Sequence, residues 1–258
     1  AAAGANGVSS PWEAMADTLK QSTALLGAQA DAASAVAGAA SGIKRDHTGN
    51  SAQHLVAAHQ SIRTAALAIQ ELGTCMMTMD MVAMEELLQE MRKAPNLYVY
   101  GVGREGLMMR SWVFRLNQLK LKAYYIGEAV CPPLSAGDLL ITSAGPAYYG
   151  TVAAMCNEAR AYGAKTAAFT ANPTAVLTFA DIVVRIPAHC PSIHDPPPAR
   201  RRNRTSAQSG YDKPSSVLLL GGQYELALHL ATDVMSTCIF QAGDMEEEGL
   251  RGQSFNVN

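Results

Sequence analysis

The sequence predicts an α/β protein in which a parallel sheet is covered by helices on both faces. Three observations support this class. The chain has 258 residues, 48% of them hydrophobic and 16% charged, which is enough apolar material for a large buried core. After Pro95, short apolar runs alternate with helix-like stretches. These runs are continuously apolar, which is typical of strands buried on both faces of a parallel sheet.

The region before Pro95 is expected to be helical. Residues 1–50 are rich in Ala, Gly and Ser, and we expect a tail or a peripheral helix there. In residues 55–72 apolar side chains recur seven positions apart, as on one face of a helix. A second helical face spans residues 80–92, with Asp80 as its N-cap. Both faces are wide enough to bury against another subunit, so they predict a homodimer or homotetramer.

The region after Pro95 is expected to alternate strands and helices. The strands are 97–100, 122–126, 139–142, 166–170 and 182–186, and the helices are 107–119, 149–162, 174–180 and 223–240. The stretch 188–216 interrupts this order, because it holds five prolines and a cluster of arginines. We expect it to form a long exposed loop.

The stretch NLYVYGVGREG, residues 96–106, places three glycines directly after the first strand. Gly101, Gly103 and Gly106 have the spacing of a dinucleotide fingerprint, in which a tight turn joins a strand to a helix N-terminus. Glu128, near the end of the next strand, would then accept hydrogen bonds from the ribose. An NAD-binding enzyme is therefore one alternative.

Two residues within the turn argue against a dinucleotide. Arg104 occupies a position that normally stays small, so that a pyrophosphate can approach the backbone. Glu105 would place a negative charge beside that pyrophosphate. A smaller anion is compatible with the turn, because backbone N–H groups and the helix dipole at a strand end favour bound anions.

Five segments, in order, resemble the SIS (sugar isomerase) domain and most of all its 6-phospho-3-hexuloisomerase branch. They are YVYGVGREGLMMRSWVFRLNQL, YIGE, GDLLITSAG, GAKTAAFTANPTAVLTFADIVVRIP and LLLGGQYELALHLATD, and they fall within about residues 60–240. The resemblance implies an αβα three-layer sandwich with a five-stranded parallel sheet in residues 51–258. It also implies a phosphosugar ligand, aldose–ketose isomerase activity without a cofactor, and assembly as a dimer or tetramer.

The resemblance and the strand ends together indicate candidate ligand-binding residues. In the family the glycine turn reads GxGRSG, which this chain matches at both outer glycines, the middle glycine and the arginine. Short hydroxyl and backbone donors at two further strand ends suit a phosphate dianion. The candidate substrate-binding residues are Gly101, Gly103, Arg104, Gly106, Ser143, Gly145, Thr151, Thr170 and Asn172.

The sequence departs from the family pattern in two places. Where the family has a hydroxyl-rich SGSGET loop, this chain reads SAGPAYYG, and Pro146 removes a backbone donor. Where the family has the serine of GRSG, this chain has Glu105. Both changes weaken a phosphate site. Either Tyr148 or Tyr149 contacts the substrate instead, or the protein is a non-catalytic phosphosugar-binding or protein-interaction module.

Glu225 is the candidate catalytic base. It matches the glutamate of the family's GTLFE segment, here GGQYE, and the isomerisation needs a base that moves a proton between C1 and C2 through an enediolate. His229 lies four residues further along the same helix face and is the candidate partner acid. His54 and His59, on the first helix, are candidates to reach a neighbouring subunit's site.

Composition and charge limit the partners. The net charge of −2 provides no field for nucleic acid or an anionic membrane, and no apolar run is long enough to span a bilayer. Five scattered cysteines predict free thiols, hence the cytosol, with an organelle such as a plastid as the alternative after N-terminal processing. The spacing of His189, Cys190, His194 and Asp195 matches no standard zinc pattern, so no metal is expected.

Overall fold

The computed structural model describes residues 50–191 and 216–243, with side chains from residue 58 onward. The described residues divide into two compact units. The first holds α2 (Asn50–Met77) and residues 216–218, where the Ser216 hydroxyl donates to Glu71 Oε2 at 2.6 Å. The second holds the sheet and the other described helices. The predictions for residues 1–49 and for most of the 188–216 loop concern residues outside this description.

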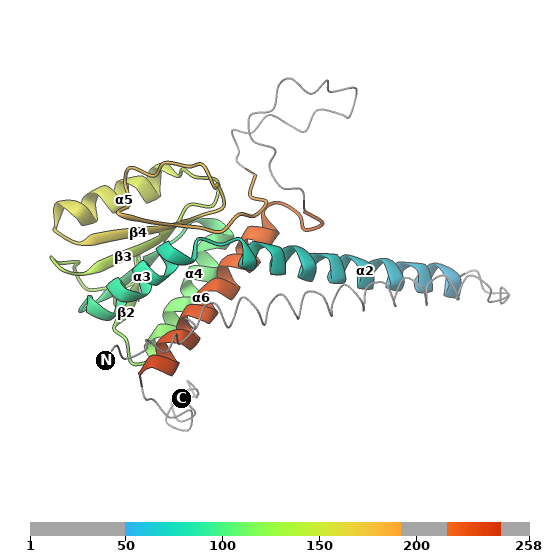
Figure 1. Cartoon of the computed structure of the whole chain (residues 1–258), viewed down its shortest axis with the longest axis horizontal. Helices are drawn as coiled ribbons and strands as arrows, with labels where there is room; N and C mark the ends of the chain where they lie inside the picture. Colours follow the sequence, from blue (N-terminus) through green and yellow to red (C-terminus); the bar gives the residue numbers. More distant parts are fainter. Residues whose placement is uncertain (1–49, 192–215, 244–258) are drawn as a thin grey trace, which may run out of the picture. The chain divides into compact units, whose positions relative to one another are not determined.

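The second unit is built on a parallel sheet with the strand order β2–β1–β3–β4–β5 (Figure 1). The strands are β1 (Leu97–Tyr100), β2 (Ala123–Tyr125), β3 (Leu139–Ser143), β4 (Lys165–Thr170) and β5 (Ile182–Arg185). This confirms the predicted five-stranded parallel sheet. Because β1 lies between β2 and β3, the strand order reverses there, and ligands of open α/β sheets bind beyond the strand ends at such a reversal.

Helices cover both faces of the sheet (Figure 1). They are α3 (Met81–Lys93), α4 (Gly103–Gln118), α5 (Gly150–Ala161) and α6 (Gly222–Ala242). On one face α3 packs against β5, while α4 packs against β1, β2 and α6. On the opposite face α5 packs against β3 and β4. The αβα sandwich implied by the resemblance is confirmed.

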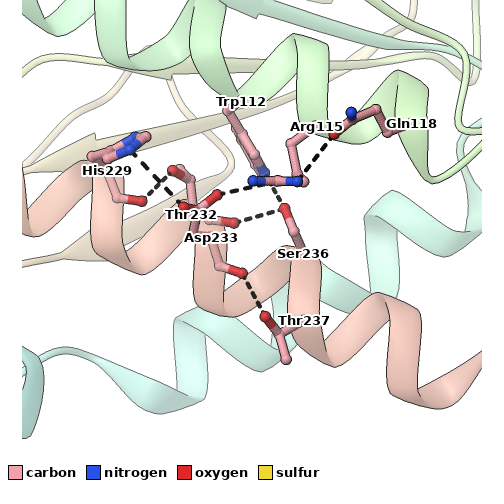
Figure 2. Close-up of polar contacts among 8 residues, drawn as sticks. All are labelled: Trp112, Arg115, Gln118, His229, Thr232, Asp233, Ser236 and Thr237. Atoms are coloured by element: carbon pink, nitrogen blue, oxygen red, sulfur yellow. Dashed lines mark hydrogen bonds and ion pairs between the residues drawn. The ribbon is translucent and has the colours of Figure 1, made fainter. Parts of the chain in front are cut away.

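Successive strand residues supply the two cores. Leu140 and Ala168 are buried with the apolar side chains of α5. Phe169, the next residue of β4, faces α4, where its ring packs edge-on against Trp112 with 6.1 Å between centroids. The Trp112 indole N–H donates to Ser236 Oγ of α6 at 3.1 Å (Figure 2). Trp112 therefore ties α4 to both the sheet and α6.

Helix α3 begins where the sequence predicts. The Asp80 side chain accepts a hydrogen bond from the Ala83 backbone N–H at 3.1 Å, which confirms the predicted N-cap. Its apolar face, however, is already buried within this chain. Met84, Leu87, Leu88 and Met91 are buried within the chain, so this helix covers its own sheet. The prediction that the 80–92 face forms a subunit interface loses its basis.

One predicted helix is absent. Residues 174–180 form turns, not a helix. Two carbonyl groups of this segment accept hydrogen bonds from side chains elsewhere in the chain: Arg185 donates to Ala175 O at 3.1 Å and Arg160 donates to Thr178 O at 2.9 Å. The other helices lie within a few residues of expectation, although α4 begins at Gly103 rather than at residue 107. Within the described residues, no helix has the length and apolar character to cross a membrane.

Candidate functional site

The glycine turn joins β1 to α4 by close backbone packing. Gly103 adopts a left-handed φ of 58°, which side-chain-bearing residues rarely take. A Cβ at Gly106 would stand 2.5 Å from Gly101 O and 2.8 Å from the Tyr125 hydroxyl oxygen. That hydroxyl itself donates to Gly101 O at 2.7 Å. Close packing between Gly101 and Gly106, together with the left-handed φ of Gly103, thus accounts for the three glycines without a nucleotide.

Glu128, the ribose acceptor in the dinucleotide interpretation, already has a partner. Its carboxylate lies 2.7 Å from Arg110 Nη1 in an ion pair at the surface. The Arg110 guanidinium also lies over the Tyr125 ring, 4.0 Å from its centroid. This surface ion pair gives Glu128 a role in the chain that needs no ribose.

Glu105 is the centre of a buried polar cluster at the end of β3. It lies in the first turn of α4 and is 3% exposed. Its Oε2 accepts hydrogen bonds from Ser143 Oγ at 2.5 Å and from the Gly145 N–H at 3.0 Å, and its Oε1 accepts one from the Tyr149 hydroxyl at 2.9 Å. The Tyr224 hydroxyl lies 3.0 Å from Ser143 Oγ. Residues of α4, β3 and α6, together with the residue preceding α5, thus meet around one carboxylate.

The protonation of this cluster follows from its burial. Burial raises the pKa of Glu105, the three hydrogen bonds lower it, and the charge of Glu225 raises it again, so that the net direction is upward. Burial, together with the charge of Glu105, also raises the pKa of the Tyr149 and Tyr224 hydroxyls. Both tyrosines therefore stay protonated at neutral pH and remain hydrogen-bond donors.

Arg104 and Glu225 form a second charged group beside this cluster. Arg104 Nε lies 3.0 Å from Glu225 Oε2, and the side chains are 64% and 10% exposed. The approach lacks hydrogen-bond geometry, so Oε2 has no hydrogen-bond partner among the described residues. Burial raises the pKa of Glu225 more than the Arg104 charge lowers it. Glu225 is thus a desolvated carboxylate with one oxygen available to accept a proton.

The remaining predicted ligand residues are used in different ways. The Thr170 hydroxyl donates to Gly145 O at 3.3 Å, and the Asn172 side-chain oxygen accepts from the Thr174 backbone N–H at 3.0 Å. Both contacts stabilise the turns that follow β3 and β4. Thr151 is exposed near the start of α5. The structure therefore gathers Ser143 and Gly145 around Glu105, while the Asn172 side chain is engaged locally.

His229, the candidate partner acid, belongs to the contact between α4 and α6 (Figure 2). Its Nε2 lies 3.9 Å from Asp233 Oδ2, and Asp233 Oδ1 lies 3.7 Å from Arg115 Nε. Its Nδ1 is buried without a hydrogen-bond partner in the described part of the chain. Its ion-pair partner in the described part of the chain is Asp233 and not Glu225, so its catalytic role stays a prediction without a supporting contact.

The other histidines give no site. His59 lies on α2, and the side chain of His54 is outside the described ones. The His189 backbone N–H donates to Gln223 Oε1 at 2.6 Å, while His194 and Asp195 fall outside the description. Among the described residues no three metal-binding side chains gather in one place.

Sequence reasoning misses two members of the Glu105 cluster. It treats Glu105 as a charge that repels an anion, whereas the structure surrounds this carboxylate with donors. A signal is present, because a carboxylate in the first turn of a helix is favoured by the helix dipole. Tyr224 gives no local signal, since only the packing of α6 brings it to Ser143.

The architecture defines a class: an open parallel α/β protein with polar and charged groups gathered at the carboxyl ends of its central strands. No family model matches the chain. It is 37% identical over 103 residues to the 3-hexulose-6-phosphate isomerase of Mycobacterium gastri, covering 40% of this chain and 52% of that protein. It is 30% identical over 104 residues to the enzyme of the same name from Bacillus subtilis, covering 40% and 56%. The chain thus spans about half the length of these relatives.

Solved structures share the fold over most of the described chain. A Methanococcus jannaschii protein, whose structure led to an inferred function of 3-hexulose-6-phosphate isomerase, has a TM-score of 0.58 at 19% identity, covering 77% of this chain and 99% of that chain. An Escherichia coli CFT073 protein in complex with A5P has a TM-score of 0.60 at 11% identity, covering 77% and 97%. At these identities the likeness shows that the chain has the fold of these proteins, a parallel five-stranded sheet flanked by helices.

Proposed function

We propose that the protein is a sugar-phosphate isomerase that acts on a 3-hexulose 6-phosphate or a similar ketose phosphate. Relatives named for that activity support the substrate class. The observation that carries the proposal is Glu225, a buried carboxylate at the ligand edge of a SIS sheet, whose Oε2 accepts no hydrogen bond from the described residues and lies in an ion pair with the largely exposed Arg104. A group of this kind is what proton abstraction next to a carbonyl requires.

Glu225 acts as the base. Its Oε2 takes the proton from the carbon beside the carbonyl and returns it to the former carbonyl carbon, through an enediolate. In a 3-hexulose the carbonyl is at C3, so the proton moves between C3 and a neighbouring carbon. This differs from the transfer between C1 and C2 in an aldose–ketose isomerisation. Burial strengthens Glu225 as a base, because it raises the pKa of its carboxyl group.

Arg104 supplies the positive charge for the substrate phosphate. Its guanidinium is largely exposed although its Nε approaches Glu225, so its remaining N–H groups are accessible to a ligand. A guanidinium makes charge-assisted, often bidentate hydrogen bonds to phosphate. This arrangement places the phosphate contact and the base on adjoining side chains.

The test is direct turnover. The purified chain is incubated with a 3-hexulose 6-phosphate, and the appearance of the 2-hexulose 6-phosphate is followed by ¹³C NMR. We expect conversion to an equilibrium mixture, reached from either side. No conversion from either side, by protein that is folded, would contradict the proposal.

A second candidate is a phosphosugar-binding module without turnover. The observation that favours it is Glu105, whose carboxylate occupies donors that a phosphate loop would offer to substrate. A thermal-shift series with sugar phosphates separates the two candidates, because a ligand that binds the native state raises the apparent Tm. A raised Tm without any turnover would favour the binding module.

A further inference from the structure

We propose that Glu105 is a built-in anion that excludes a ligand's phosphate from the donors at the end of β3. The inference goes beyond the assignment of an activity, and it rests on the proposed function in taking this strand edge as the ligand edge. It makes Glu105 a specificity-determining residue, because it leaves Arg104 as the phosphate contact.

The donors around Glu105 form the kind of set that an anion needs. Two hydroxyls and one backbone N–H point at its carboxylate over 2.5 to 3.0 Å. Behind them the Tyr224 hydroxyl lies 3.0 Å from Ser143 Oγ, so it can donate to Ser143 while Ser143 donates to Glu105. Short hydroxyl donors combined with a backbone N–H at a strand end and a helix start are what phosphate oxygens bind. In this chain a side-chain carboxylate takes that place.

No room is left for a second anion beside the carboxylate. Ser143 is 0% exposed, and Glu105 is 3% exposed. A single Cβ added at Gly145 would stand 2.8 Å from Glu105 Oε1 and 2.6 Å from Tyr224 Cε1. A phosphate, which is far larger than a methyl group, fits these donors only if the Glu105 side chain leaves them.

Electrostatic repulsion excludes phosphate from these donors, as the lack of room does. A phosphate monoester carries about 1.5 to 2 negative charges at neutral pH, so it would meet like charge at Glu105. The neighbouring Glu225 adds a second carboxylate, since its charge already raises the pKa of Glu105. The positive charge of Arg104 lowers the pKa of Glu225, and the Arg104 side chain is largely exposed. The phosphate is therefore drawn to Arg104, away from the end of β3.

Removing the Glu105 carboxylate should open the donors to phosphate. Glu105→Ser shortens the side chain and frees all three donors, and Glu105→Ala does the same without adding a hydroxyl. Glu158→Ser is the matched control, because Glu158 is an exposed glutamate on α5. Inorganic phosphate is the probe, and its dissociation constant is measured by isothermal titration calorimetry near neutral pH, with folding checked by circular dichroism.

We expect Glu105→Ser to bind phosphate about tenfold or more tightly than the unmodified chain, a factor that one charge-assisted hydrogen bond can supply. Glu158→Ser should not change the affinity. A folded Glu105→Ser protein that binds phosphate no more tightly would overturn the proposal. If that variant does not fold, Glu105→Ala, which also vacates the space, decides: a gain of about threefold or more supports the exclusion, and no gain overturns it.

This proposal and the proposed function can fail separately. Turnover by the unmodified chain together with no gain in phosphate affinity would overturn only the exclusion by Glu105. A gain in phosphate affinity in Glu105→Ser together with no turnover by the unmodified chain would overturn only the isomerase assignment.

Discussion

Glu225 and Arg104 connect the structure to a measurable pH dependence. The base works as a carboxylate, and burial raises its pKa above that of an exposed glutamate, about 4.3. We therefore expect kcat/KM to fall as the pH drops through this raised pKa, at a higher pH than an ordinary glutamate would give. In Arg104→Gln the charge that lowers the pKa is gone, so the acid limb should move to still higher pH.

The control for that shift is Arg110→Gln. Arg110 pairs with Glu128 at the surface and is not among the causes of the Glu225 shift. Its removal should leave the acid limb where it is. An acid limb that stays unmoved in Arg104→Gln, or moves to lower pH, would be inconsistent with Glu225 as the titrating base.

Glu105 should also affect how the free energy of unfolding depends on pH. Its folded-state pKa lies above its unfolded value, because burial outweighs its hydrogen bonds. Such a group contributes stability that is fully present below the unfolded pKa and is lost as the pH rises through the folded pKa. The free energy of unfolding of the unmodified chain, minus that of Glu105→Gln, should therefore decrease from the ordinary carboxyl range upward in pH.

Urea denaturation at a series of pH values measures this difference, and it cancels contributions common to both proteins. A difference that stays constant with pH would show that Glu105 does not titrate differently in the folded chain. An increase with pH would reverse the assigned direction of its pKa shift.

The turn between β1 and α4 depends on one glycine more than on its neighbours. A Cβ at Gly106 would clash with the Gly101 carbonyl oxygen and with the Tyr125 hydroxyl, which is itself hydrogen-bonded to that oxygen, so there is little freedom to relax. Overpacking of this kind costs about 1–3 kcal/mol, so we expect Gly106→Ala to lower the free energy of unfolding by about that amount. Gly150→Ala is the control, because nothing lies within 4 Å of an added Cβ there. Equal losses in both variants would contradict this role of Gly106.

The success of strand prediction has a local cause. The central strands β1, β3 and β4 are short runs whose side chains are mostly buried on both faces, and this pattern is visible in consecutive residues. The segment 174–180, where the predicted helix is absent, is held by non-local contacts, because arginines from α5 and β5 donate to two of its carbonyl groups. Such contacts appear only after the sheet has formed, so a window of sequence does not contain them.

The candidate site divides in the same way. The glycine turn, Ser143 and Glu225 follow from motif spacing at strand ends and from the family resemblance. The hydrogen bonds that hold Glu105 could not be predicted in this way, because its partners Gly145 and Tyr149 lie 40 and 44 residues away in the sequence. The ion pair of Arg104 with Glu225 likewise joins the first turns of α4 and α6, two helices that are far apart in the sequence.

Assembly is expected from the exposed apolar residues of α2. Ile62 is 58% exposed and Ile69 is 45% exposed, seven residues apart on that helix. We expect a dimer or tetramer by light scattering at micromolar concentration, and we expect Ile62→Asp with Ile69→Asp to reduce the mass. Val130→Asp, at an 81% exposed position outside the helices, is the control. A monomeric mass for the unmodified chain would remove this prediction.

The most direct measurement is exchange of the transferred hydrogen with solvent. A 2-hexulose 6-phosphate such as fructose 6-phosphate is incubated in D₂O with the unmodified chain or with Glu225→Gln, and deuterium next to the carbonyl is followed by NMR. We predict incorporation with the unmodified chain, and a rate lower by about two to four powers of ten with Glu225→Gln, which keeps its shape but cannot accept the proton. Exchange that continues at full rate in Glu225→Gln, or that never occurs in the unmodified chain, would contradict Glu225 as the base of an isomerase.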